Sequence, residues 1–85
     1  MTTKYIKTKD NKIIVFGEVF QHKEFIHKGP ISAGFISFGI NKIGNPICTC
    51  YGESISLNLK SEPEDTVLAM TQILGYEDWM IDENM

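Results

Sequence analysis

The sequence contains no arginine, because all eight of its basic residues are lysines. Recognition of bases and phosphates favours the forked guanidinium group of arginine, so we expect no nucleic-acid partner. Long apolar runs are absent too: none approaches the roughly 20 residues that a membrane-spanning helix needs. The opening Met-Thr-Thr-Lys-Tyr lacks the apolar segment of a secretory signal. We therefore expect no membrane partner and a cytoplasmic location.

Cysteine is scarce, since Cys48 and Cys50 are the only two. They are too few for the disulfide framework of a small secreted domain, and on one strand face they would lie too far apart for a relaxed disulfide. With His22 and His27 they could form a four-ligand zinc site. A Cys-x-Cys pair in a strand is an unusual source of zinc ligands, and buried cysteine commonly acts as a small apolar residue. We predict no metal and no cofactor, and keep zinc binding as the alternative.

Catalytic motifs are also missing. A cysteine nucleophile would need one of the two histidines within hydrogen-bond reach, and both are expected in a surface loop. The segment from Gly52 to Ser56 lacks the final glycine of a nucleophile elbow. The glycine spacing matches neither a dinucleotide-binding nor a phosphate-binding loop. The sequence therefore predicts a protein that is not an enzyme and has no catalytic residues.

The length and composition that remain indicate one folded domain. Eighty-five residues allow a single core, and 42% hydrophobic with 22% charged residues is typical of a globular protein. The charge is uneven, because seven of the eight lysines precede Ile43 and eight of the eleven acids follow it. Lysines protecting an N-terminal edge strand explain this, as does a basic or acidic face for a partner. We expect one domain over 1–85, with an acidic tail at 82–85 that frays.

Alternation of apolar and polar residues predicts an antiparallel sheet. Glycine- and asparagine-containing turns are expected at 9–12 and 41–45, and 21–30 is expected to be a loop that can include a single helical turn. The predicted fold is α+β, an antiparallel sheet of four or five strands with one C-terminal helix packed on one face. The expected strands cover 4–8, 13–20, 31–40 and 47–59, the last interrupted by a bulge or bend at Gly52.

The C-terminal helix is marked at both ends. Ser61 fits an N-cap, Glu64 the capping-box acid three residues on, and Gly75 the left-handed residue that ends a helix. These signals predict a helix over about 62–74. Capping also explains why three acids, Glu62, Glu64 and Asp65, lie at the N-terminal end of this helix. We therefore infer no acid–base cluster there.

The predicted core combines the apolar faces of strands and helix. Ile55, Leu57 and Leu59 give the cleanest alternation in the chain and are expected to face inward. The full predicted core is Ile14, Phe16, Phe35, Ile36, Phe38, Ile55, Leu57, Leu59, Val67, Met70 and Leu74.

The residues after the helix carry the best candidate for partner contact. Trp79 is flanked by methionine and acids, a composition typical of interface hot spots. The sole tryptophan of a small domain also commonly closes its own core. We predict partner-binding residues Trp79, Tyr76 and Met80.

Three motifs carry a family resemblance: Ser32-Ala33-Gly34-Phe35, the Cys50-x-Gly52-x-Ser54-x-Ser56-Leu57 run, and Ser61-x-Pro63-x-Asp65. They make the second half similar to small proteins of gut-anaerobe genomes, phages and mobile elements, which implies a compact stand-alone protein but no activity. Segment 13–20 is apolar on both faces and must be covered on both. We therefore hypothesise a small protein-binding or regulatory module whose partner is another protein or, as a homo-oligomer, a second copy.

Overall fold

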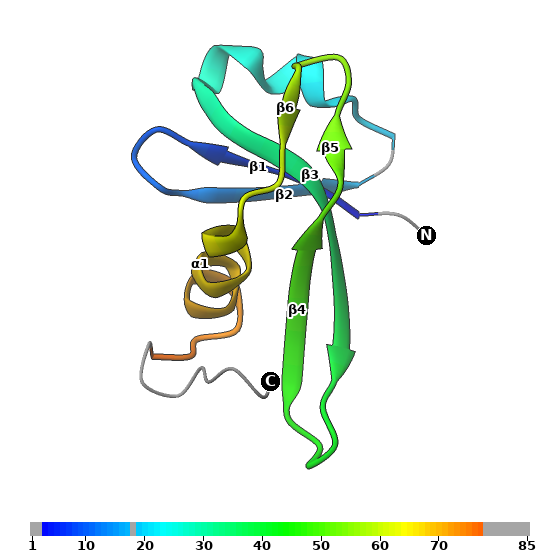
Figure 1. Cartoon of the computed structure of the whole chain (residues 1–85), viewed down its shortest axis with the longest axis vertical. Coiled ribbons are helices and arrows are strands. Elements are labelled where there is room, and N and C mark those ends of the chain that lie inside the picture. The colour runs from blue at the N-terminus through cyan, green and yellow to red at the C-terminus, as the bar shows by residue number, and fades with distance from the viewer. Residues whose placement is uncertain (1–2, 18, 78–85) are drawn as a thin grey trace.

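A computed structural model describes residues 3–17 and 19–77 (Figure 1). Four antiparallel strands form the main sheet in the order β2-β1-β3-β4, and α1 packs against it, which confirms the predicted α+β fold. No described helix is both long and apolar enough to cross a membrane. The elements are β1 (Thr3–Thr8), β2 (Ile13–Gly17), 3₁₀ helix η1 (His22–Lys28), β3 (Pro30–Ile40), β4 (Pro46–Tyr51), the short pair β5 (Glu53–Ser54) and β6 (Leu59–Lys60), and α1 (Pro63–Ile73).

The two hairpins of the main sheet use the same kind of turn. In the first, the Thr8 carbonyl accepts from Asn11 N–H at 2.9 Å, and Thr8 N–H donates to the Lys12 carbonyl at 2.9 Å. Asn11 has the left-handed φ of 64° that such a three-residue loop requires. In the second, Gly44 takes this place with φ 89°, and its N–H donates to the Asn41 carbonyl at 3.0 Å. Both predicted turns are confirmed.

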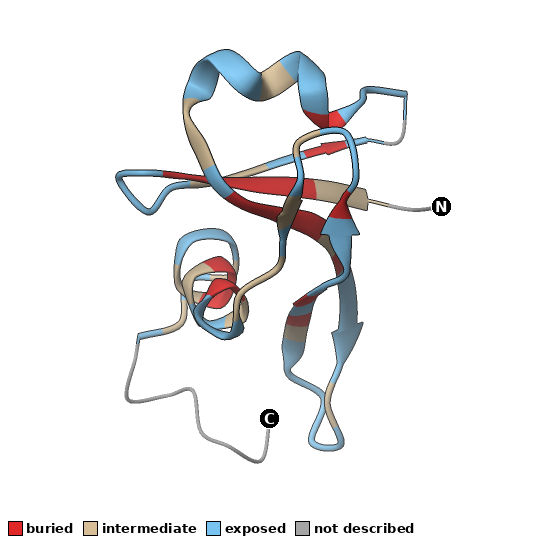
Figure 2. Ribbon diagram, turned by 45° about the horizontal axis from the view of Figure 1, so that its top comes forward, coloured by how far each residue is buried: buried red, intermediate tan, exposed pale blue. Residues whose placement is uncertain are grey.

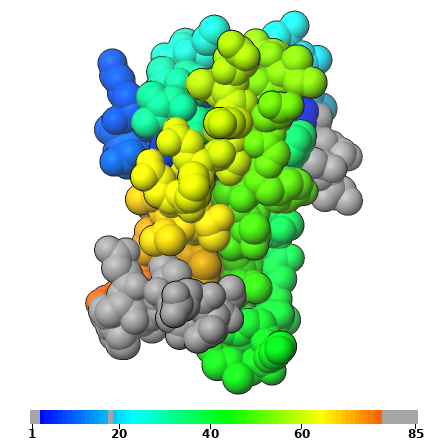
Figure 3. Space-filling model, viewed as in Figure 1, coloured from blue at the N-terminus to red at the C-terminus, as the bar shows by residue number. Residues whose placement is uncertain are grey.

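Strand β3 is long and curved, and it joins the two halves of the sheet (Figure 1). Its first part pairs with β1 and its last part with β4, with Ile36 matched to residues of both neighbours. A Cβ at Gly34 would lie 2.3 Å from the Tyr51 carbonyl oxygen, so only glycine permits this close crossing. Beyond Ile36, β3 and β4 continue as a two-stranded arm, seen at the lower end of Figure 3.

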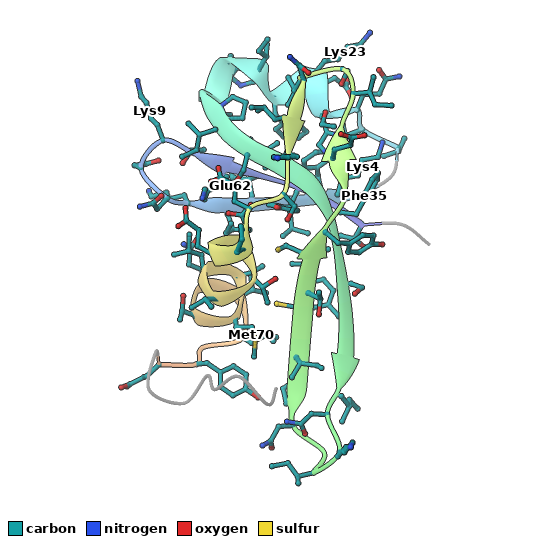
Figure 4. The ribbon with its side chains drawn as sticks, in the orientation of Figure 1. Lys4, Lys9, Lys23, Phe35, Glu62 and Met70 are labelled. Carbon is teal, nitrogen blue, oxygen red and sulfur yellow. The ribbon has the colours of Figure 1, made fainter. Side chains whose placement is uncertain are left out.

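The core consists of two apolar clusters on opposite faces of the sheet, and Figure 2 shows buried stretches of the sheet and of α1 in red. Met70 lies between α1 and β4 in the first cluster (Figure 4), and Phe16 stacks on Phe25 of η1 in the second. This arrangement follows from strand alternation, because Tyr5 and Ile6 are neighbours that point to opposite faces. The buried members are Tyr5, Ile36, Cys48, Cys50, Ala69 and Met70 in the first cluster, and Ile6, Phe16 and Ala33 in the second.

Part of the predicted core is wrong. Gly52 separates β4 from β5 as predicted, but the chain then turns between β5 and β6, which leaves Ile55 88% exposed. Phe38 is 50% exposed because it lies on the arm, past the last β3 residue that pairs with β1. Val67 on α1 is also exposed. Phe16, Ile36 and Met70 are buried as predicted.

The start of α1 lies one residue later than the sequence suggested. Glu62, rather than Ser61, is the N-cap residue, and Glu62 N–H donates to Asp65 Oδ2 at 3.1 Å. Asp65 therefore replaces Glu64 as the capping-box acid. The Ser61 hydroxyl instead forms a hydrogen bond with the Tyr5 hydroxyl, with 2.8 Å between the two oxygens. The helix ends as predicted, with Gly75 at φ 79°.

Candidate functional site

A buried ion pair joins the sheet to the start of α1. Lys7 of β1 has no exposed side-chain surface, and its Nζ lies 2.7 Å from Glu64 Oε1 and 2.8 Å from Asp65 Oδ1. The expectation that the N-terminal lysines protect an edge strand is wrong here, because β1 is an inner strand and Lys7 points under the helix. Asp65 is equally buried, so two opposite charges meet out of contact with water.

The second carboxylate oxygen of Asp65 gathers three donors. Oδ2 accepts from the Tyr5 hydroxyl at 2.5 Å, from the Ser32 hydroxyl at 2.7 Å and from Glu62 N–H at 3.1 Å. Oδ1 accepts no aligned hydrogen bond from the described residues, although Lys7 Nζ faces it as an ion pair. A buried carboxylate is tolerated when it is paired and hydrogen-bonded in this way.

The surroundings fix the charge of each group in this network. Burial alone would raise the pKa of Asp65, but the Lys7 ammonium and the hydroxyls of Tyr5 and Ser32 outweigh it and hold the pKa below its ordinary 3.8. Burial would lower the pKa of Lys7, but Asp65 and Glu64 keep it above 10.5. Burial and the bond to Asp65 raise the pKa of Tyr5. None of the three titrates near neutral pH, which suits an anchor better than an acid–base catalyst.

An open hollow of about 800 Å³ lies beside this anchor, between the β5–β6 hairpin and the start of α1. Two of its lining residues, Ser61 and Glu62, also form hydrogen bonds with Tyr5 and Asp65 of the network. Figure 4 shows Glu62 at the first turn of the helix. Lys7 and Asp65 have no exposed side-chain surface, so the hollow does not open onto the ion pair. It is lined by Ile31, Glu53, Ile55, Leu59, Lys60 and Pro63, among others.

The residues considered for zinc are not brought together. Cys48 and Cys50 are free, buried thiols on the α1 face, and burial raises the pKa of Cys50 to about 12. His22 belongs to the other face and was wrongly expected at the surface: it is buried, with Nε2 2.8 Å from the Gly34 carbonyl oxygen. His27 is exposed. The described part of the chain holds no group of three or more histidine, cysteine or acidic residues fit for a metal.

Of the predicted partner-binding residues, the structure describes only Tyr76. It is half-buried against the α1-side cluster, and its hydroxyl donates to the Pro46 carbonyl at 2.6 Å. Tyr76 thus has a role within its own chain. Trp79 and Met80 lie outside the described residues, as does the tail at 82–85.

The outer edge of β4 is closed by α1 and the residues after it. Cys50 N–H donates to Thr66 Oγ1 at 3.0 Å, and the Pro46 carbonyl accepts from Tyr76. Both backbone groups sit on the last strand of the sheet, where a free row of donors and acceptors would invite another strand. Side chains from the helix end of the chain bond these two groups, and Cys48 between them is buried against α1.

The outer edge of β2 is closed only at its two ends. At its start, Ile13 N–H donates to Gln72 Oε1 at 2.8 Å, while Gln72 Nε2 donates to the Asn11 carbonyl at 2.6 Å. At its end, the Gly17 carbonyl accepts from Phe20 N–H at 3.1 Å. The stretch between these two ends has no such cover from the described residues.

Strand alternation identifies the groups that remain open. Thr8 and Lys12 form a bonded pair beside the turn, so every second residue of β2 from Ile13 onward directs its N–H and carbonyl away from β1. Four outward groups are left without a partner among the described residues: the Ile13 carbonyl, the Val15 N–H, the Val15 carbonyl and the Gly17 N–H. Val15 is 37% exposed, and a Cβ built at Gly17 would meet nothing within 4 Å. We call this stretch the open β2 edge.

A second exposed surface runs along the β3–β4 arm. Phe38, Ile40 and Ile43 are each at least half exposed. Scattered apolar residues are common on protein surfaces, whereas an exposed strand edge offers a row of backbone donors and acceptors with which another strand can pair. The open β2 edge is therefore the stronger candidate site. The chain matches no protein-family model, no curated protein and no solved structure.

Proposed function

We propose that this chain is a non-enzymatic protein-binding module that accepts an extended protein segment along the open β2 edge. The observation that carries the proposal is the set of four outward backbone groups at Ile13, Val15 and Gly17. Adding a strand to an exposed sheet edge is a common mode of peptide recognition, with backbone hydrogen bonds supplying the affinity. Here the chain covers both ends of the edge and leaves its middle open.

The side chains of β2 indicate what an added strand would meet. Ile14 and Phe16 point to the η1 face, and Ile13 and Val15 to the α1 face. No described residue of β2 is charged. A segment with apolar residues on both of its faces would therefore continue both clusters of the core, whereas a charged segment would be desolvated without a partner.

The polar groups elsewhere support binding rather than catalysis. The Lys7–Asp65 pair holds fixed charges and has no exposed side-chain surface. Activating a nucleophile would require a base within hydrogen-bond reach, and burial keeps Cys50 as a protonated thiol at neutral pH. The buried polar groups therefore serve to place α1, which in turn determines how much of each sheet edge is covered.

The proposal is tested by titrating the ¹⁵N-labelled protein with the synthetic peptide Lys-Thr-Val-Ile-Val-Thr-Lys, which has apolar residues on both of its strand faces. We expect saturable shifts and slowed hydrogen exchange at the Val15 and Gly17 amides. Val15→Pro removes an outward N–H without breaking a bond to β1, so it should abolish binding and keep the fold. Val15→Thr keeps the N–H and should bind like the original chain. Shifts that spare the β2 amides, or equal binding by Val15→Pro, would refute the proposal.

A further inference from the structure

The open β2 edge is complementary to itself. Resting on the proposed function, we infer that the strand it accepts is β2 of a second copy of this chain, paired antiparallel about a two-fold axis at Val15. Such a pair places Val15 opposite Val15, and Ile13 opposite Gly17 of the second copy. This is an isologous contact, in which one surface serves both copies.

The hydrogen bonds available to this pair match the open groups. The two Val15 residues would exchange both of their N–H to carbonyl bonds, because Val15 directs both groups outward. Gly17 N–H of each copy would donate to the Ile13 carbonyl of the other. These four bonds use every open group of both edges and leave none over.

The remaining bonds of a full ladder are the ones that each chain already satisfies internally. A complete Ile13–Gly17 pair would also join Ile13 N–H to the Gly17 carbonyl. Gln72 Oε1 already accepts from Ile13 N–H, and Phe20 N–H already donates to the Gly17 carbonyl. In the dimer, Ile13 N–H of one copy and the Gly17 carbonyl of the other would lie within hydrogen-bond distance, so Gln72 and Phe20 would have to move aside and these two groups would bond each other instead.

The side chains agree with the two-fold register. Ile14 would lie opposite Phe16 of the second copy on the η1 face, in the closer type of antiparallel pair. Aromatic and β-branched residues stabilise one another when they lie directly across two strands. The described β2 residues carry no charge, so pairing this strand with itself brings no like charges together.

The oligomeric state tests this inference. In sedimentation equilibrium at several concentrations, the average mass of the full chain should rise from that of a monomer to that of a dimer. Val15→Pro should stay monomeric with an unchanged circular-dichroism spectrum, and Val15→Thr should dimerise like the original chain. If Val15→Pro unfolds, Gly17→Pro removes the other outward N–H and Gly17→Ala serves as its control, since the space beside Gly17 is open.

The register has its own measurement. In a sample mixed from labelled and unlabelled chains, the Hα atoms of Ile14 and of Phe16 from the other copy should show a nuclear Overhauser effect. A strict monomer whose Val15 and Gly17 amides still respond to the synthetic peptide would overturn the second-copy inference and leave the proposed function standing. A monomer whose edge ignores the peptide would overturn both. A dimer that survives both proline variants would place the interface elsewhere and overturn the inference.

Discussion

The two outer strands of the sheet differ in how completely the rest of the chain covers them, although α1 touches both. On β4, Thr66 and Tyr76 bond backbone groups of Cys50 and Pro46, and Cys48 between them is buried under α1. On β2, Gln72 reaches only the first residue, and the groups at Val15 stay open. The difference shows that a single helix on a four-stranded sheet can block one edge and expose the other.

The position of the helix determines which edge is covered, and the buried network fixes that position. Asp65 stands at the start of α1 and is held by Tyr5 and Lys7 from β1. This fixed end brings Thr66 beside β4, and one and a half turns later the helix presents Gln72 to β2. Substitutions in the buried network should therefore affect the coverage of both edges, whereas substitutions at Thr66 or Gln72 should affect one edge each.

The largest effect is expected from Asp65→Ala, which breaks the anchor. It leaves the buried Lys7 ammonium with Glu64 alone and the Tyr5 and Ser32 hydroxyls without their shared acceptor, at a cost of about 3–5 kcal/mol in the free energy of unfolding. A small domain has roughly 5–15 kcal/mol in total, so much of its stability would be lost. Urea denaturation gives the value.

The matched control replaces both charges, as in Lys7→Met with Asp65→Leu. Because apolar residues of similar size often substitute for a buried ion pair without loss, this double variant should be more stable than Asp65→Ala. A cost below about 1 kcal/mol for Asp65→Ala would contradict the anchoring role.

The second prediction concerns pH. The folded pKa of Asp65 lies below its ordinary value, so its stabilising contribution is complete above about pH 4 and is lost as the pH falls through the folded pKa. Folding raises the pKa of Cys50 from 9.0 to about 12 and raises those of Tyr5 and Lys7. Their contributions are therefore lost as the pH rises above about 9, the Cys50 step first.

Thermal unfolding from pH 2 to 11 would show both losses. The Lys7→Met, Asp65→Leu double variant should lack the Asp65 step in acid, and Cys50→Ala should lack the first alkaline step. Acid and alkaline limbs that are the same in all of these variants would show that other groups control the pH dependence.

A smaller effect is expected from Thr66→Val, which opens β4. It removes the acceptor of Cys50 N–H and should cost about 1–3 kcal/mol, the penalty for an unsatisfied buried backbone group. Hydrogen exchange at the Cys50 amide should become faster, while exchange at Ile13 should stay unchanged. Thr66→Ser keeps the hydroxyl and should leave both amides protected. Unchanged exchange at Cys50 in Thr66→Val would show that this contact does not close the edge.

The smallest effect is expected from Gln72→Ala, which opens the start of β2. Its two hydrogen bonds are exposed, so the loss should stay below about 1 kcal/mol each. Exchange at the Ile13 amide should become faster and exchange at Cys50 should not change. Gln72→Glu can still accept from Ile13 N–H and serves as the control. Equal protection of Ile13 in all three proteins would contradict the contact.

The parts of the fold that depend on neighbouring residues were predictable from the sequence. Both hairpin turns and the glycine that ends α1 need particular residues at particular positions, and Asn11, Gly44 and Gly75 supply them. Strand order is not local: either strand of the first hairpin could pair with β3, so the alternation of 13–20 could not show that β2 is the outer strand. The apolar pattern of segment 53–60 likewise could not reveal that Ile55 lies in a turn.

The site was largely missed for the same reason. Lysines near an N-terminus are usually solvated, and the partner of Lys7 lies 58 positions further along the chain. Capping alone explained Asp65, so nothing pointed to its second role. The one available signal was that Lys7 shares a strand face with Tyr5, a face that the structure shows to be buried. The four open backbone groups of β2 could not be predicted either, because the amino-acid sequence does not show which backbone groups of a strand lack a partner.

The double use of Asp65 bears on how the protein folds. The same carboxylate accepts the N–H of the residue that begins α1 and the hydroxyls and ammonium of the sheet. An isolated helix of 11 residues is marginal in water. Formation of α1 and its docking on the sheet therefore depend on one shared group, and the chain is expected to gain its helix and its tertiary structure in a single cooperative transition.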